Sequence, residues 1–454
     1  MPSQLYGPPP HPRQVHVDLE MLNHPELYAL CLGVGLAVSL LAMVKRWPPA
    51  LRAWCFISGQ VLMLTAPLGA VFTRHVFGAY PTIDKSGSLL FYLEGVHRTV
   101  TFHPIEALSD PAARLIGVHV GHLWVTAFFD LFLEPFAAFN VQGLLYPALG
   151  WWCAALLLRE FSESWRVAVV LAWPFGMGLH VFRDLNWYTI EKASVFALAL
   201  LAWALVKAWK SGGRWTWVTG LVYVGAAFLN WYWALVGAAG AALVLAVTRS
   251  RDVAKACAWS AGLALPLVAY QYALLSGPGT LGDPETFLNE RASQDVFSLV
   301  PLAWNRLEVH RAVNMVVAGL AFFGALAGLR VRFVQGVLAV ASGLFLLSLG
   351  PYLVHEVQNP VYMLLHTVMP GFWRVAKPEV FFEGTYLCLL VLAAWQVRGR
   401  RIEAAWFYPL WVPAWLILVR THPAYPEFSE FVEMHLADDW AERRGLVPEM
   451  TAPP

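Results

Sequence analysis

The first candidate for chemistry is an acidic residue in a short polar turn. Asp84 and Lys85 lie between the flanking residues YPTI and SGS. A carboxylate in such a turn is presented to its surroundings, where it could accept a proton from a hydroxyl group as a general base, or hold a divalent cation. The sequence does not choose between these two roles.

Candidate cations stand at the ends of apolar runs. Arg183 follows one such run, and Arg374 and Lys377 precede another. A following proline biases Lys377 away from the helical conformation, and Glu379 and Glu383 come next, one turn apart. Ionisable groups at the edge of a membrane span are costly unless they are paired or face a wet cavity. Glu379 therefore either belongs to a site or forms a structural salt bridge with Arg374 or Lys377.

Further ionisable or amide side chains occur in the same polar segments and could support a site. They are Glu94, Asn186, Glu191, Arg291 and Asp295. For any single one of them a solvated loop position is the simpler interpretation, because exposed charges are the rule. The occurrence of several such residues in the same polar segments indicates a site more strongly than any one of them does.

Motifs of soluble enzymes are missing. The sequence contains no Gly-rich phosphate loop and no GxSxG, HExxH or CxxC pattern. The five cysteines fall in or beside apolar runs, where cysteine behaves as a small buried hydrophobe. They predict neither a metal site nor a disulfide framework.

The elements that must position the candidate residues are membrane helices. Hydrophobic residues make up 58% of the chain and charged residues 13%, against roughly 25% charged residues in soluble domains. A helix needs about 20 mostly apolar residues to cross the hydrocarbon. The sequence predicts an all-α polytopic integral membrane protein with twelve spans, near residues 27–44, 53–73, 138–158, 166–182, 193–209, 215–229, 231–248, 256–275, 312–329, 333–354, 380–397 and 404–420.

The short connections between these runs predict the orientation in the membrane. About half of the 31 Lys and Arg residues lie in alternate links, at 45–52, 159–166, 207–214, 249–255, 330–332 and 398–401. A Lys/Arg excess in short loops marks the cytoplasmic face. Both termini are then exocytoplasmic, as are the long segments 74–137, 276–311, 355–379 and the residues after 420.

One apolar stretch, residues 116–134, is not expected to cross the membrane. It contains His119, His122, Asp130 and Glu134, and an Asp at a helix centre costs roughly 3 kcal/mol. A span here would also break the alternation of the basic links. We expect an amphipathic helix that lies at the outer interface, within the first long outer loop.

The domain organisation is simple. We expect a single transmembrane domain, residues 1–420, and a short exocytoplasmic tail, residues 421–454. The first 26 residues are polar and Pro-rich and lack the pattern of a cleaved signal, so the helices themselves are expected to direct insertion. The net charge is only +1, with basic residues scattered over the links, which gives no support for nucleic-acid binding.

Six motifs occur in a characteristic order over residues 54–397. They are TIDKSG, which contains Asp84; HLWVTAFFDLFLEPFAAFN; FRDLNWYTIE; SQDVFSLVP; LSLGP; and MPGFWRVAKPEVFF. This order resembles the GT-C glycosyltransferase superfamily, specifically its bacterial YfhO-like branch. In the last motif the family carries a second Arg where this chain has Glu379, with Lys377 nearby as a stand-in.

The resemblance implies a GT-C-like fold in the bacterial inner (cytoplasmic) membrane. It also implies transfer of a sugar from a polyprenyl-phosphate carrier to an acceptor on the exocytoplasmic face. Asp84 would be the catalytic residue, with a divalent cation left open as cofactor. Arg374, Lys377 and Arg183 would bind the carrier phosphate, since charge on a leaving phosphate is best stabilised by preorganised cations.

Two other function classes stay open. A catalytically degenerate membrane scaffold would keep the spans and lose the site. A lipid or saccharide transporter would carry ionisable residues or broken helices at the bilayer midplane. The predicted spans 138–158, 231–248, 312–329 and 333–354 have no charges in their middles, which favours the transferase over the transporter.

Overall fold

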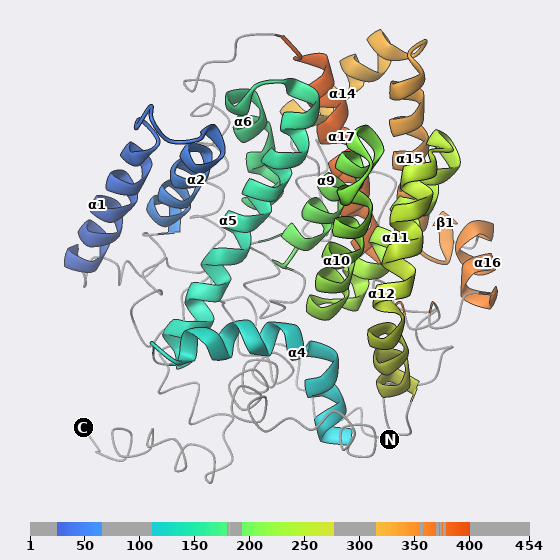
Figure 1. Cartoon of the computed structure of the whole chain (residues 1–454), viewed down its shortest axis with the longest axis horizontal. Coiled ribbons are helices and arrows are strands. Elements are labelled where there is room, and N and C mark those ends of the chain that lie inside the picture. The colour runs from blue at the N-terminus through green and yellow to red at the C-terminus, as the bar shows by residue number, and fades with distance from the viewer. Residues whose placement is uncertain are drawn as a thin grey trace.

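The computed structural model describes residues 25–65, 111–133, 135–178, 181, 193–276, 315–354, 357–368, 372, 375 and 378–399. Its first helices are α1 (Pro25–Leu41), α2 (Pro49–Thr65), α4 (Pro111–Asp130), α5 (Pro135–Ser162), α6 (Trp165–Gly176), α9 (Phe196–Ser211), α10 (Arg214–Leu229), α11 (Trp231–Thr248) and α12 (Arg251–Ser276). Then come α14 (Met315–Gly328), α15 (Arg332–Ser348), the strands β1 (Tyr352–Val354) and β2 (Val357–Gln358), α16 (Pro360–Val368), the 3-10 helix η7 (Pro378–Val380) and α17 (Phe381–Gln396) (Figure 1).

The described part of the chain is almost entirely helical, and its one sheet is the antiparallel β1–β2 hairpin. Four of the described helical segments are long and apolar enough to cross a membrane. They are Val141–Ser162, Trp231–Thr248, Arg251–Leu274 and Pro378–Gln396. Shorter apolar helices include Trp165–Gly176 and Arg332–Ser348. The predicted class, an all-α membrane-associated protein, agrees with these observations.

Short links reverse the chain between neighbouring helices. Arg249 ends α11 in the left-handed conformation, and its N–H bonds to the carbonyl of Leu245. At the other end of the same helix, the side chain of Asn230 accepts a hydrogen bond of 2.9 Å from the N–H of Tyr232. Such a cap satisfies one of the donors that a helix start leaves unpaired. Antiparallel packing of consecutive helices follows from these tight turns.

The links that carry the basic residues share one end of the bundle, which we call the basic end. Glu160 at the end of α5 pairs with Lys207 and Lys210 of α9, at 3.4 and 3.7 Å. Glu163 in the α5–α6 link pairs with Arg398, just after α17. In Figure 1 this end is at the top, where the α1–α2 and α14–α15 turns also lie. We call the opposite end of the bundle the distal end.

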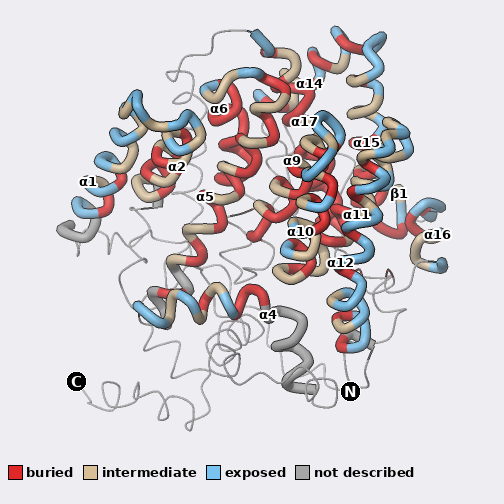
Figure 2. The backbone as a smooth tube through the Cα atoms, viewed as in Figure 1, coloured by how far each residue is buried: buried red, intermediate tan, exposed pale blue. Residues whose placement is uncertain are grey.

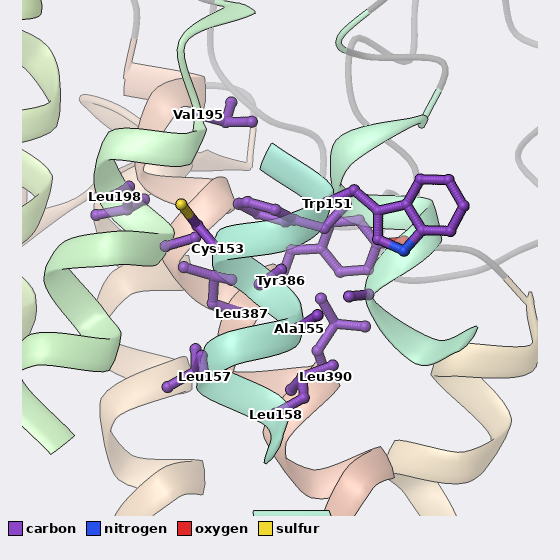
Figure 3. Close-up of a cluster of buried hydrophobic side chains, with 14 of the residues drawn as sticks. Trp151, Cys153, Ala155, Leu157, Leu158, Val195, Leu198, Tyr386, Leu387 and Leu390 are labelled. Atoms are coloured by element: carbon purple, nitrogen blue, oxygen red, sulfur yellow. The ribbon is translucent and has the colours of Figure 1, made fainter. Parts of the chain in front are cut away.

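The core joins segments that are far apart in the sequence. Figure 3 shows Trp151 and Leu158 of α5 among the same buried side chains as Tyr386 and Leu390 of α17, and Figure 2 shows that buried residues gather in these central helices. A Cβ atom on Gly176 of α6 would collide with the backbone of Trp151. Small residues allow membrane helices to pack this closely, because helix association in lipid depends on van der Waals contact.

The second half of helix α4 runs across the distal end of the bundle, at an angle to its first half (Figure 1). Gly121 on α4 lies against the backbone carbonyl of Phe228, in the last turn of α10. The helix also contacts α5 and α12. Trp124 and Phe128 on this helix are exposed, as is Phe132 just after its end. The helix predicted over 116–134 thus exists, with bounds shifted a few residues towards the N-terminus.

The predicted span over 333–354 is wrong in its last residues, because α15 ends at Ser348. Gly350 has a φ of +71°, in the left-handed region that favours glycine, and Pro351 has no N–H with which to continue a helix. The chain then forms the β1–β2 hairpin and α16. The predicted span over 404–420 and the tail after it lie outside the described residues.

The two ends of the bundle should face opposite sides of the membrane. Ser211, at the basic end, and Gln358, at the distal end, are both exposed. In intact cells we expect a membrane-impermeant maleimide to label Gln358→Cys, whereas Ser211→Cys should react only after the membrane is permeabilised. Labelling of Ser211→Cys in intact cells would contradict the orientation.

Candidate functional site

Two groups of buried polar side chains lie at the distal end of the bundle. The α4–α5 network consists of His122, Thr126, Gln142 and Tyr146. The acidic corner consists of Asn359, Tyr362, Glu379 and Glu383, around the start of α17. Burial of a polar side chain costs free energy unless the side chain is hydrogen-bonded. Both clusters are therefore candidates for a role beyond hydrophobic packing.

Hydrogen bonds of the α4–α5 network connect the two helices directly. The side-chain nitrogen of Gln142 donates to the Tyr146 hydroxyl at 2.7 Å and to the backbone carbonyl of His122 at 3.1 Å. The hydroxyl of Thr126 donates to the side-chain oxygen of Gln142. The hydroxyl of Tyr146 lies 2.8 Å from Nδ1 of His122. That hydroxyl also accepts from Gln142, and the tautomer of His122 sets which of the two groups donates in the bond between Tyr146 and Nδ1.

This network explains how α4 is held across the ends of other helices. Its four side chains are buried, and a satisfied polar network in a low-dielectric interior fixes one arrangement of its members. Gln142 and Tyr146 are one turn apart on α5, so both face α4. The position of the crosswise helix therefore depends on hydrogen bonds as well as on packing.

The acidic corner places two carboxylates where the chain enters α17. Glu379 is 3% exposed and Glu383 is 1% exposed. Negative charge is favoured at the N-terminus of a helix, where unpaired N–H groups carry partial positive charge. The first turns of α17 are fixed against α15 by the hydroxyl of Thr385, which donates to the carbonyl of Ala341 at 3.3 Å.

The acidic corner affects the pKa of Tyr362 on α16. Burial raises the pKa of its phenol, and the nearby carboxylate of Glu379 raises it further. The hydroxyl donates to the carbonyl of Val375 at 3.1 Å. Tyr362 thus connects α16 to the segment between α16 and α17.

The short segment before α16 is anchored to α15 by one amide. The side-chain nitrogen of Asn359 donates to the carbonyls of Leu346 and Gly350, at 2.6 and 2.9 Å. Its side-chain oxygen accepts from the N–H of Tyr362 at 3.3 Å. These bonds satisfy two carbonyls at the end of α15 that have no partner within the helix.

Aromatic rings continue the anchoring towards α17. The rings of Tyr362 and Phe372 meet edge to face with centroids 5.1 Å apart, and Phe372 lies 6.1 Å from Phe381. All three side chains are buried. The acidic corner is therefore built on well-packed neighbours from α15, α16 and α17, as a site needs if its carboxylates are to keep one position.

Carboxylates in such a position could accept protons or offset the charge of cations. Two negative charges in a low-dielectric environment repel strongly unless positive groups lie close. Arg374 and Lys377 are the cations nearest to Glu379 in the sequence. Among the described residues, no group of three or more His, Cys, Asp or Glu side chains could hold a metal ion.

Comparisons of the chain with protein-family models, with curated proteins and with solved structures find no match. The function proposed below therefore rests on the fold and on the arrangement of the residues.

The structure describes one of the predicted site residues. Glu379 is buried in the acidic corner. The predicted catalytic Asp84, the phosphate-binding Arg374, Lys377 and Arg183, and the supporting Glu94, Asn186, Glu191, Arg291 and Asp295 lie outside the described residues. For these nine residues the site stays a prediction.

Sequence reasoning missed most of the α4–α5 network. The sequence marks His122 as a polar residue in an apolar stretch, but its partners Gln142 and Tyr146 lie in a predicted span and resemble ordinary span residues. The one signal in the sequence was their spacing of four residues, which places them on one helix face. Nothing in the sequence alone indicates that this face meets α4.

The network should contribute measurably to stability. Gln142→Leu would leave the buried Tyr146 and Thr126 hydroxyls short of partners, at a cost of about 1–3 kcal/mol. The same substitution at Gln335, which is exposed and bonds to the carbonyl of Leu329, should change stability by about 0.5 kcal/mol or less. Unfolding of both purified variants in mixed micelles by increasing fractions of denaturing detergent measures the difference. Equal losses for the two variants would contradict the role of the network.

Proposed function

We propose that the chain is a membrane glycosyltransferase of the GT-C type, which moves a sugar from a polyprenyl-phosphate carrier to an acceptor on the exocytoplasmic face of the bacterial cytoplasmic membrane. Twelve spans, with both termini exocytoplasmic, would hold the site. The basic end is the cytoplasmic one, because short loops rich in Lys and Arg remain inside. The distal end, with the acidic corner, then faces outward.

The observation that carries the proposal is the position of the acidic corner. Glu379 and Glu383 are buried at the distal end of the bundle, directly after the segment that contains Arg374 and Lys377. A lipid-linked phosphate has its charge at the membrane–water boundary and its hydrocarbon chain in the bilayer. Acidic and basic residues that lie close together in the sequence at this edge of the bundle suit the binding of such a molecule.

Each predicted residue has a role in this proposal. Arg374, Lys377 and Arg183 hold the carrier phosphate and stabilise the charge that develops as the sugar leaves. Asp84 takes the proton of the acceptor hydroxyl as general base, or else holds a divalent cation. Glu379 keeps the two neighbouring cations oriented towards the phosphate.

Helix α4 fits the interfacial role that the sequence suggests. Trp124 and Phe128 on α4 and Phe132 just after it are exposed and aromatic, and aromatic side chains favour the boundary between hydrocarbon and water. An amphipathic helix at that boundary would close the outer side of the membrane domain beside the first outer loop.

A transporter is less well supported than a transferase. In the described helices α5, α9, α10, α11, α12, α15 and α17, the Asp, Glu, Lys and Arg residues fall within about one and a half turns of a helix end, whereas transporters place binding groups near the midplane. A catalytically degenerate scaffold differs from the proposal only in activity, so the assay below decides between them.

The assay uses the full chain in phospholipid vesicles with a panel of polyprenyl-phosphate sugars, and measures the released polyprenyl phosphate by mass spectrometry. Loss of a general base slows a reaction on the order of 100- to 10,000-fold, so we expect Asp84→Asn to show this loss and yet to fold normally. Arg374→Ala should instead raise the KM for the carrier. Asp252→Asn at the basic end, which removes a carboxylate 3.7 Å from Lys255, is the matched control and should keep the full rate.

Two outcomes would overturn the proposal. If the wild-type chain released no polyprenyl phosphate from any carrier in the panel, the scaffold interpretation would stand. If Asp84→Asn kept the rate of the Asp252→Asn control, Asp84 would have no catalytic role.

A further inference from the structure

Helix α16 has one buried face and one apolar exposed face. Tyr362 points inward and is 2% exposed. On the other side Val361, Leu364 and Val368 are 44%, 61% and 63% exposed, and Val357 of β2 before them is 60% exposed. Spacings of three and four residues place Val361, Leu364 and Val368 on one face of α16, and Val357 lies just before that helix. We call these four residues the α16 stripe.

The depth of α16 follows from its anchoring to α15. That helix starts at Arg332 at the basic end and has 17 residues, which corresponds to a length of about 25 Å at 1.5 Å per residue. The hydrocarbon core of a bilayer is about 30 Å thick. Asn359 bonds to the carbonyls of Leu346 and Gly350 at the far end of α15, so α16 begins at the height where hydrocarbon gives way to headgroups.

The chemistry around the stripe also favours lipid over water. Residues 351–368 contain no Lys or Arg and a single carboxylate, Glu356. Leu346, in the last turn of α15, is exposed as well, and lies on the same end of α15 to which Asn359 is bonded. Contiguous apolar surface of this kind on a membrane protein indicates contact with the membrane.

We propose that α16 lies in the outer boundary of the bilayer, with the α16 stripe in contact with phospholipid acyl chains. This inference goes beyond the proposed function, because it requires only that α15 spans the membrane with its start at the cytoplasmic face, and it does not depend on any enzymatic activity. The inference has a consequence for the acidic corner. The face of α16 opposite the stripe carries Tyr362, which lies close enough to Glu379 for that carboxylate to raise its pKa. Contact between α16 and lipid would hold the acidic corner at a fixed depth below the membrane surface.

The test measures the depth of fluorescent labels in the full chain. Leu364→Cys and Val361→Cys are labelled with an environment-sensitive fluorophore in a background in which Cys257 and Cys388, the two half-exposed cysteines, are replaced by Ala. The proteins are reconstituted in phosphatidylcholine–phosphatidylglycerol vesicles. Quenching by phospholipids with a nitroxide near the headgroup or deep in the chain is compared with quenching by aqueous iodide.

Two further labels calibrate the depth scale. Phe322→Cys lies on the exposed side of α14, near the middle of that helix, and Lys255→Cys lies in an exposed position at the basic end. We expect both stripe labels to be quenched severalfold more strongly by the shallow nitroxide than by iodide, whereas the Phe322 label responds most to the deep nitroxide and the Lys255 label to iodide.

Two results would overturn the inference. Iodide quenching of both stripe labels as strong as that of the Lys255 label would place α16 in water. Self-quenching of the labels that grows with the protein-to-lipid ratio would instead indicate that a second copy of the chain covers the stripe.

Discussion

A charged side chain is costly in hydrocarbon unless it has a partner, and the architecture of this chain follows from that constraint. In its long apolar helices, the described charges gather at the helix ends, where they meet one another or water. At the basic end Glu160 lies between Lys207 and Lys210, and Glu163 meets Arg398. These pairs are partly exposed, so each contributes little to stability. Their importance is positional, because they bring α5, α9 and α17 to the same height.

The distal end satisfies the same constraint in a different way. There the side chains of the α4–α5 network and of Asn359 are buried, and they form hydrogen bonds with protein groups in place of water. Gln142 bonds to Tyr146 and to the carbonyl of His122, and Asn359 covers the carbonyls at the end of α15. Among the described residues the two ends are thus chemically distinct: the basic end carries partly exposed ion pairs, and the distal end carries buried hydrogen-bonded side chains.

Much of the fold could be predicted from the sequence because its signals are local. Apolar runs and basic links predict where α5, α9, α10, α11 and α12 begin and end to within a few residues, and the polar residues of 116–134 single out α4. The early end of α15 was also visible in principle, since Gly350 and Pro351 both disfavour helix. The partners of His122 and Asn359 could not be predicted, since they depend on contacts between helices. For the candidate site, the position of Glu379 at the edge of an apolar run predicts a site residue, and the structure shows that its side chain is buried.

The packing of α17 has a consequence for the order of events during synthesis. Tyr386 and Leu390 complete the core around Trp151 and Leu158. At a rate of about 5–20 residues per second, the roughly 235 residues from Trp151 to Tyr386 take on the order of tens of seconds to make. During that time the inward surface of α5 lacks its final partner, and lipid or other helices must cover it. Helix α17 is synthesised after the helices that it contacts in the finished core. The nascent chain therefore passes through an incomplete bundle, in which large aromatic side chains such as Trp151 are not yet fully buried.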